Sequence, residues 1–207
     1  MARFVLVHGA WHGGWCFEQV AGELERRGHA VEAPDLPCDR VGRTVHDYAA
    51  LIGPRPDAVV IGHSMGGLTI PFVEARMRVY LAALLPLENV YADALLEDFD
   101  GFLRDEQGRS YWPDRETAFA KLYPDCAREV SDAAFRRLRP QARIDPVPCP
   151  VSAGDVFVVT VRDRAVDPAW QCRAAAEHGL RAFELDAGHS PFLTHAAELA
   201  ALLDSLA

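Results

Sequence analysis

Short runs of apolar residues alternate with stretches of helical periodicity along most of the chain, and this alternation limits the possible folds more than any other feature. Within each run the apolar residues are mostly consecutive, which is typical of strands buried on both faces. Such strands form a parallel sheet that helices cover on both sides. The runs predict six strands, at residues 3–7, 29–33, 57–61, 79–85, 155–161 and 180–185. We therefore expect an α/β fold with a six-stranded, mainly parallel, doubly wound sheet.

Helical patterns separate these runs, at residues 15–27, 44–52, 65–76, 168–178 and 191–206. The interval 88–150 departs from this rhythm. It has no convincing strand, it is rich in aromatic residues, and it shows helical patterns at 93–104, 114–122 and 131–138. We interpret the interval as a helical lid inserted into a single domain whose core comprises residues 1–87 and 151–207. The alternative is an ordinary helical layer packed on the core.

The overall composition excludes several classes of protein. The 207 residues suffice for one domain with a sizeable core, and the net charge of −9 disfavours nucleic acid and anionic membrane partners. The five cysteines are odd in number and show no CxxC spacing, so we expect neither a disulfide framework nor a zinc site. No run has membrane-spanning length, and the chain starts with a strand pattern instead of a secretory leader. We expect a reduced, cytoplasmic protein without cofactor.

The segment Gly62-His63-Ser64-Met65-Gly66 carries the clearest chemical signal. It follows an apolar strand and precedes a helical pattern, which is the context of a nucleophile elbow. Glycine on either side leaves room for the sharp turn because it has no Cβ. We therefore expect the Ser64 hydroxyl to protrude at the carboxyl end of the sheet.

Serine is a weak nucleophile without a base, and the base should follow it in the chain. His189 lies in the loop after the last predicted strand, where an imidazole can reach Ser64, whereas His195 falls inside the last helix. Asp163 stands at the carboxyl end of the strand 155–161 and can orient His189. Asp167 is the rival acid, although it reads better as the N-cap of the next helix. Ser64, Asp163 and His189 are the predicted triad.

A developing oxyanion needs backbone donors, and two positions are suited to supply them. Met65 directly follows the nucleophile, and Ala10 lies in the glycine-rich loop after the first strand. His8 is expected to brace this loop. His8 and His12 have the spacing of metal ligands on a helix, but in such a loop we expect no metal. Trp11 and His12 either line the pocket or only pack against neighbouring side chains.

Four motifs in the same order resemble those of α/β-hydrolases related to plant methylesterases and hydroxynitrile lyases. They are the stretches Phe4–Trp15, Gly62–Gly67, Asp163–Val166 and Gly188–Pro191. The resemblance covers almost the whole chain outside the interval 88–150. It implies an α/β-hydrolase fold, the triad of Ser64, Asp163 and His189, and oxyanion donors at Ala10 and Met65.

The chain departs from this family in two informative ways. The lyase members carry a threonine and a lysine where Gly9 and Ser190 stand here, so lyase activity is not expected. The stretches 34–57 and 85–150 are also shorter than in the family, which implies a reduced lid and a more open pocket. Apolar surface left by such a lid could be covered in a homodimer.

These features together predict a serine hydrolase that cleaves the ester bond of a small molecule, with thioesters and lactones as related substrates. The first alternative is a biosynthetic cyclase or thioesterase with the same triad. The second is a non-catalytic ligand-binding protein on the same scaffold. Four side chains are expected to form the substrate-binding wall, namely Trp11, His12, Phe102 and Trp112. Such a wall would suit an apolar or aromatic group.

Overall fold

The computed structural model describes residues 1–207 and contains one large sheet in which all neighbouring strands are parallel. Its strand order is β2-β1-β3-β4-β7-β8. The strands are β1 (Arg3–Val7), β2 (Ala30–Glu32), β3 (Arg55–His63), β4 (Ala75–Leu81), β7 (Val156–Thr160) and β8 (Arg181–Leu185). The predicted fold class is confirmed, and each predicted strand overlaps one of these.

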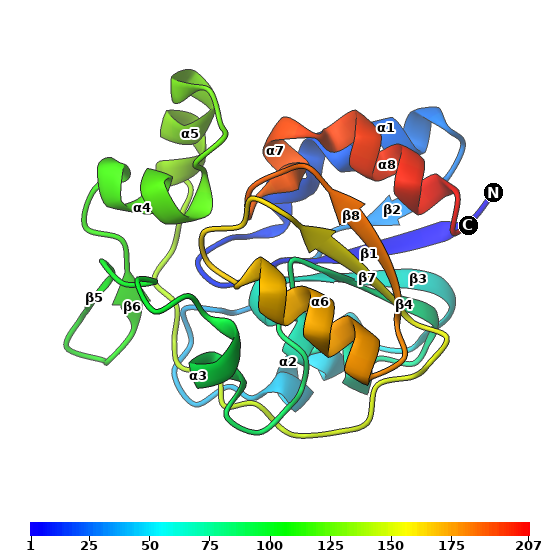
Figure 1. Ribbon diagram of the computed structural model, residues 1–207, viewed down its shortest axis with the longest axis horizontal. Helices are drawn as coiled ribbons and strands as arrows, with labels where there is room; N and C mark the ends of the chain where they lie inside the picture. The colour runs from blue at the N-terminus through cyan, green and yellow to red at the C-terminus, as the bar shows by residue number, and fades with distance from the viewer.

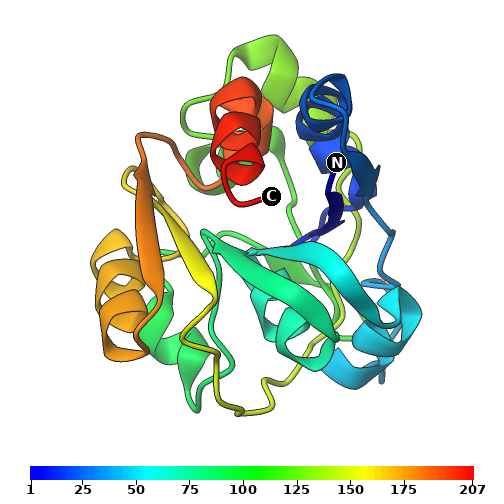
Figure 2. The ribbon, with the colours of Figure 1, turned by 90° about the vertical axis from the view of Figure 1, so that its right-hand side faces the viewer.

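Two layers of helices cover the sheet, as Figures 1 and 2 show. On one face lie α1 (Glu18–Arg26), α7 (Pro191–Thr194) and α8 (Ala196–Asp204), and on the other lie α2 (Val45–Ile52), α3 (Val90–Ala94) and α6 (Pro168–Glu177). A hydrophobic core lies on each face of the sheet. Phe4 and Leu6 of β1 pack in the core under α1, α7 and α8, and Val5 and Val7 pack in the core on the opposite face. Because successive side chains enter opposite cores, the strand is apolar at consecutive positions.

The helix predicted over residues 65–76 is not present. Two short 3-10 turns, η2 (Ser64–Leu68) and η3 (Ile70–Phe72), take its place, and β4 begins at Ala75. The chain must cross from the end of β3 to the start of β4 within residues 64–74, close to the shortest length for a crossover with a helix. Pro71 lacks the amide hydrogen that a continuous helix would need there. The strand predicted at 79–85 is accordingly displaced toward the N-terminus.

Other elements differ less from expectation. The helix predicted over 15–27 starts as a 3-10 turn, η1 (Gly14–Phe17), and the pattern 191–206 is divided between α7 and α8 at His195. None of the helices has both the length and the apolar character required to cross a bilayer.

The interval 88–150 contains α3, α4 (Arg115–Leu122), α5 (Arg128–Phe135) and an antiparallel hairpin of β5 (Leu103–Arg104) and β6 (Ser110–Tyr111). The expectation of a helix over 93–104 and of no strand is therefore wrong. The helix α3 ends at Ala94, because Leu95 is extended, with φ of −76° and ψ of 142°, and forms an antiparallel bridge with Val166. In Figure 1, α4, α5 and the hairpin lie on the left, the side toward which the strand arrows point. The interval thus lies beside the carboxyl edge of the sheet, where ligands bind in such folds.

Candidate active site

Ser64 directly follows β3 and adopts a left-handed backbone conformation with φ of +51°. Such a conformation costs a residue other than glycine about 1–3 kcal/mol, so the surroundings must hold it. A Cβ at Gly62 would lie 2.9 Å from backbone atoms of Gly66, and a Cβ at Gly66 would lie 2.7 Å from the carbonyl oxygen of Val7. Real Cβ atoms do not approach so closely, so the tight turn requires glycine at both positions. Ser64 itself stays partly exposed.

His189 lies in the loop between β8 and α7, with one ring nitrogen toward Ser64 and the other toward Asp163. Its Nε2 is 3.1 Å from Ser64 Oγ, and its Nδ1 is 2.9 Å from Asp163 Oδ2. A carboxylate can only accept a hydrogen bond, so Nδ1 carries the hydrogen and Nε2 is left to accept one from the serine hydroxyl. The structure thus brings together the three residues predicted from the sequence, each from the carboxyl end of a strand.

The carboxylate of Asp163 is buried, and five donors surround it. Oδ1 accepts the N–H groups of Ala165 and Val166 at 2.8 and 3.0 Å. Oδ2 accepts the hydroxyl of Thr160 at 2.8 Å, the amide of Gln171 at 3.1 Å and the imidazole of His189. A carboxylate with this many donors is held in one orientation. Thr160 and Gln171 could not be predicted as partners of Asp163, because neither belongs to a recognisable motif.

The rival residues have other partners. Asp167 caps α6, because its carboxylate accepts the N–H groups of Ala169 at 3.0 Å and Trp170 at 3.2 Å. His195 lies between α7 and α8 and hydrogen-bonds Thr194 at 2.7 Å. Neither side chain hydrogen-bonds Ser64.

The loop between β1 and η1 approaches the elbow closely. A Cβ on Gly9 would lie 2.8 Å from the Cβ of Ser64, so only glycine fits there. The N–H of the next residue, Ala10, donates to no atom of the protein and is available to a ligand. Ala10 and Met65, the two expected oxyanion donors, line the same cavity as Ser64.

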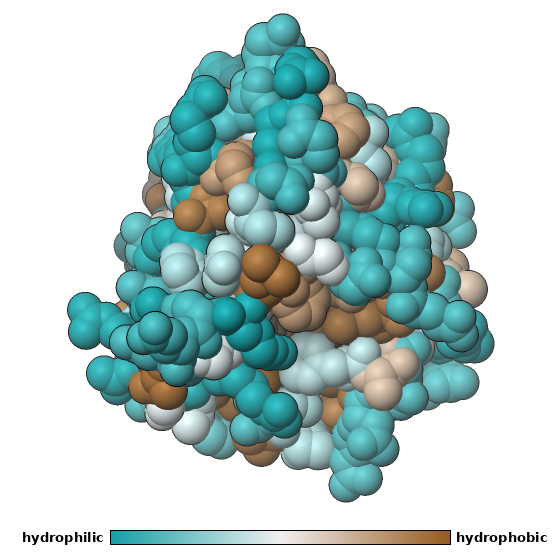
Figure 3. All heavy atoms as spheres, turned by 90° about the vertical axis from the view of Figure 1, so that its left-hand side faces the viewer, coloured by the Kyte–Doolittle hydropathy of each residue, from teal (hydrophilic) through white to brown (hydrophobic).

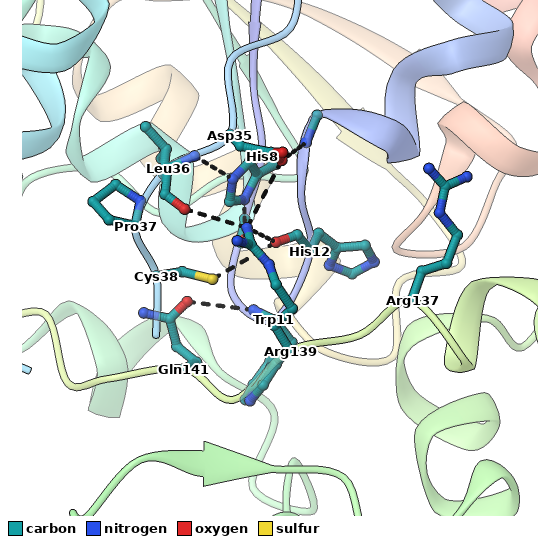
Figure 4. Close-up of polar contacts among 12 residues, drawn as sticks. His8, Trp11, His12, Asp35, Leu36, Pro37, Cys38, Arg137, Arg139 and Gln141 are labelled. Atoms are coloured by element: carbon teal, nitrogen blue, oxygen red, sulfur yellow. Dashed lines mark hydrogen bonds and ion pairs between the residues drawn. The ribbon is translucent and has the colours of Figure 1, made fainter. Parts of the chain in front are cut away.

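Side chains from distant parts of the chain hold this loop in place, as Figure 4 shows. The N–H of Leu36 donates to His8 Nε2 at 2.9 Å, so His8 braces the loop as expected. Trp11 has φ of +64°, again a strained value, and its backbone pairs with residues 139–141. The carbonyl of Trp11 accepts the N–H of Arg139 at 2.8 Å, and its N–H donates to Gln141 Oε1 at 3.3 Å. The guanidinium of Arg139 also donates to the carbonyl of His12 at 2.9 Å.

Three further histidines are buried behind the nucleophile, and all are neutral near pH 7. Burial lowers the pKa of His8 to about 4 and that of His12 to about 3, and it holds the pKa of His63 well below its ordinary value. His63 Nε2 lies 2.8 Å from the carbonyl of His189 and fixes the backbone that carries the base. No group of three or more His, Cys, Asp or Glu side chains is arranged to hold a metal ion.

A cavity of about 360 Å³ opens above Ser64. Ten of its fifteen lining residues are apolar, and several come from the interval 88–150. The lining is Ala10, Trp11, Ser64, Met65, Leu84, Tyr91, Leu95, Phe99, Phe102, Arg104, Ser110, Gln141, Arg143, Ile144 and Ala165. A larger polar hollow of about 530 Å³ lies around Asp39–Arg43 and Arg109. It includes no triad residue, so the smaller cavity is the candidate substrate site.

Two of the four expected pocket residues line this cavity, Trp11 and Phe102, and two do not. His12 lies behind the loop, where its Nδ1 is 2.8 Å from the carbonyl of Ala10 and its Nε2 is 2.8 Å from the hydroxyl of Tyr123. Trp112 packs edge-on against Trp11, with ring centroids 5.3 Å apart, and supports the wall from outside. Hydrogen bonds thus hold His12 away from the cavity, whereas Trp112 lies behind rings that line it.

Residues 4–202 match the model of a family described as the alpha/beta hydrolase family. The chain is 38% identical to the carbendazim hydrolyzing esterase of Nocardioides sp. (strain SG-4G), in a match that covers 46% of this chain and 48% of that protein. It is 26% identical to Methylesterase 10 of Arabidopsis thaliana, over 99% of this chain and 91% of that protein. In the first of these matches the chain spans about half the length of its relative.

Among solved structures, a methylesterase from Arabidopsis, MES16, superposes with a TM-score of 0.81. The match covers 100% of this chain and 98% of that chain at 21% sequence identity. At this identity the similarity shows a shared fold. Both the sheet and the segment at its carboxyl edge are therefore parts of a known architecture.

Proposed function

Because this chain belongs to the alpha/beta hydrolase family, we propose that it is a serine hydrolase that cleaves a carboxylic ester through an acyl-enzyme on Ser64. One observation carries the proposal, namely the hydrogen-bonded series from Ser64 through His189 to Asp163, with links of 3.1 and 2.9 Å. A partly exposed nucleophile, a base within hydrogen-bond distance of it and a buried, fully hydrogen-bonded acid are the parts that acyl transfer requires.

In the first half of the reaction, Ser64 Oγ attacks the acyl carbon while His189 Nε2 takes its proton. The negative charge that develops on the carbonyl oxygen is stabilised by the N–H groups of Ala10 and Met65. Asp163 stabilises the imidazolium that forms. His189 then gives its proton to the leaving alkoxide, and the alcohol departs from an acyl-Ser64 ester.

In the second half, a water molecule attacks the acyl-enzyme and transfers a proton to His189. The same donors stabilise the second tetrahedral intermediate. Its collapse releases the carboxylic acid, and the proton on His189 returns to Ser64 Oγ. Each step uses only groups within or beside the cavity.

The interval 88–150 acts in this proposal as a reduced lid. It supplies Tyr91, Leu95, Phe99 and Phe102 to the cavity wall. These side chains exclude water and favour an ester with an apolar or aromatic part. Activity that did not increase from short aliphatic to aryl or longer aliphatic p-nitrophenyl esters would contradict this role.

The nucleophile can be tested with a fluorophosphonate probe and a series of p-nitrophenyl esters. Wild-type protein should be labelled and should turn over, and Ser64→Ala should lose both. Asp163→Asn should keep the fold but lower kcat by about 10³–10⁴-fold, because the imidazole then takes the wrong tautomer. Ser205→Ala, an exposed serine at the end of α8, is the matched control. Labelling that survived Ser64→Ala would refute the proposal, and binding of esters without turnover would favour the ligand-binding alternative.

A further inference from the structure

The cavity above Ser64 combines an apolar wall with two cationic groups, and this combination was not anticipated from the sequence. Arg104 of β5 and Arg143 are the only charged residues in its lining, and neither aspartate nor glutamate lines it. The chain as a whole carries a net charge of −9. The sign of charge at the cavity is therefore opposite to that of the molecule, and such a local field attracts anions.

Arg104 has no carboxylate partner. Its guanidinium lies over the ring of Phe102, 5.8 Å from the ring centroid, and one of its nitrogens donates to the carbonyl of Gly108 at 2.9 Å. Cation–π contact and this hydrogen bond hold the guanidinium beside a residue that itself lines the cavity. Several of its N–H groups remain free to bind an acceptor.

Arg143 lies near the C-terminal end of the interval 88–150 and also lines the cavity. Its only ion pair is with Asp145, at 2.7 Å, and both side chains are largely exposed, at 78% and 70%. Exposed pairs of this kind contribute little, so a ligand carboxylate can share or replace Asp145 at low cost. The strand bridge between Ser110 and Gln141 joins the two stretches that carry the arginines.

Figure 3 looks onto the carboxyl edge of the sheet. Apolar side chains gather near the middle of this face, and hydrophilic residues surround them. A substrate that fits must therefore be apolar where it meets the wall and polar only at defined points. The volume of about 360 Å³ is near the lower end for small-molecule sites, so the substrate is compact.

We infer that the substrate is a compact ester that carries a carboxylate at the end remote from the scissile bond, and that Arg104 and Arg143 bind this carboxylate. The inference rests on the proposed esterase function and adds the chemical class of the substrate. Guanidinium groups bind carboxylates through paired, charge-assisted hydrogen bonds, which neutral esters cannot form. The two arginines select among esters, whereas Ser64 and His189 act on all of them.

Two matched pairs of esters test the inference. The p-nitrophenyl monoester of adipic acid is compared with p-nitrophenyl hexanoate, and the acetate ester of 4-hydroxyphenylacetic acid with that of its amide. In each pair the molecules differ mainly in the remote charge, placed in the acyl half or in the alcohol half. Wild-type kcat/KM should be higher for the anionic member of at least one pair, by about tenfold to a hundredfold. This preference should shrink as the salt concentration rises.

The double variant Arg104→Gln/Arg143→Gln should remove the preference, because kcat/KM for the anionic member falls, chiefly through KM, by more than kcat/KM for the neutral member. Arg173→Gln is the control, since Arg173 is an exposed residue of α6 away from the cavity. Equal kcat/KM for both members of each pair in the wild type would overturn the inference. An equal loss for both members in the double variant would overturn it as well.

Equilibrium binding keeps this test separate from the test of the proposed function. Titration calorimetry on Ser64→Ala measures binding of the same intact esters, with and without the arginine substitutions. Tighter binding of the anionic member that depends on the arginines supports the inference even if the wild-type chain hydrolyses no ester, in which case only the esterase function fails. Equal binding of both members refutes the inference whatever the turnover.

Discussion

Gly9 packs directly against the nucleophile elbow and carries the next residue's N–H toward Ser64, so Gly9→Ala has a clear expected effect. The added Cβ would lie 2.8 Å from Ser64 Cβ, 3.0 Å from His63 Nδ1 and 3.1 Å from the carbonyl oxygen of His63. Ordinary contact begins near 3.4 Å, so the loop and the elbow must separate by roughly half an ångström. Two of the three contacts are to backbone or Cβ atoms, which cannot rotate away.

This displacement would act on the oxyanion donor next to it. Misplacing a catalytic group by about 1 Å costs on the order of 10²-fold, and losing one oxyanion donor costs about 10²–10³-fold in kcat. A shift of half that size in the N–H of Ala10 should therefore lower kcat by about 10–100-fold. KM should change less than kcat, because most of the cavity wall comes from residues outside this loop. Crowding should also lower the free energy of unfolding by about 1–3 kcal/mol.

The assay is kcat and KM on one p-nitrophenyl ester together with thermal unfolding. Gly22→Ala is the matched control, because Gly22 lies inside α1 and no atom lies within 4 Å of its added Cβ. That control should keep full activity and gain about 0.5–1 kcal/mol of stability from its higher helix propensity. A Gly9→Ala protein with wild-type kcat would refute the reasoning. A threonine at position 9, as in the lyase members of the family, would need still more room.

Two further predictions concern stability. The free energy of unfolding should fall as the pH drops below 6.5, by about 1.4 kcal/mol per pH unit for each of His8 and His12. Burial lowers their pKa values to about 4 and about 3, so only the unfolded chain takes up protons in this range. Urea unfolding at stepped pH measures this slope, and a flat profile would mean that the native protein binds these protons. Tyr80→Phe should raise the thermal midpoint, because the hydroxyl of Tyr80 is buried without a hydrogen-bond partner. Scanning calorimetry measures this midpoint, and a lower value would mean that the hydroxyl forms a hydrogen bond in solution.

Local patterns in the sequence were sufficient to predict the sheet and the family. Consecutive apolar residues in β1 and β3 signal burial on both faces, and the family that the four motifs indicated is confirmed by the match over residues 4–202. Ser64, Asp163 and His189 each lie within a few residues of the carboxyl end of a strand, so the carboxyl edge of the sheet was enough to predict that they lie together. The helix predicted over 65–76 is wrong because Pro71 interrupts it and the distance to β4 is short; the proline is a local signal, whereas the distance depends on where β4 begins.

The contacts that hold the catalytic groups in place lay beyond the reach of sequence patterns, since they join segments far apart in the chain. Gln171 reaches Asp163 from the next helix, and nothing near either residue in the sequence predicts the pairing. The clearest case is Trp11, whose strained backbone is kept in place by Arg139 and Gln141 from the end of the interval 88–150.

This last contact changes how the interval is understood. An insertion that only roofed the pocket could be shortened without effect on the catalytic groups, but residues 139–141 also fix the loop that carries Ala10. A left-handed conformation at Trp11 is retained only while its surroundings enforce it. The backbone bond from Arg139 to Trp11, at 2.8 Å, and the side-chain bond from Gln141 therefore bear on the oxyanion site directly. In the proposed function, the C-terminal end of the interval therefore positions the oxyanion donor as well as contributing to the roof.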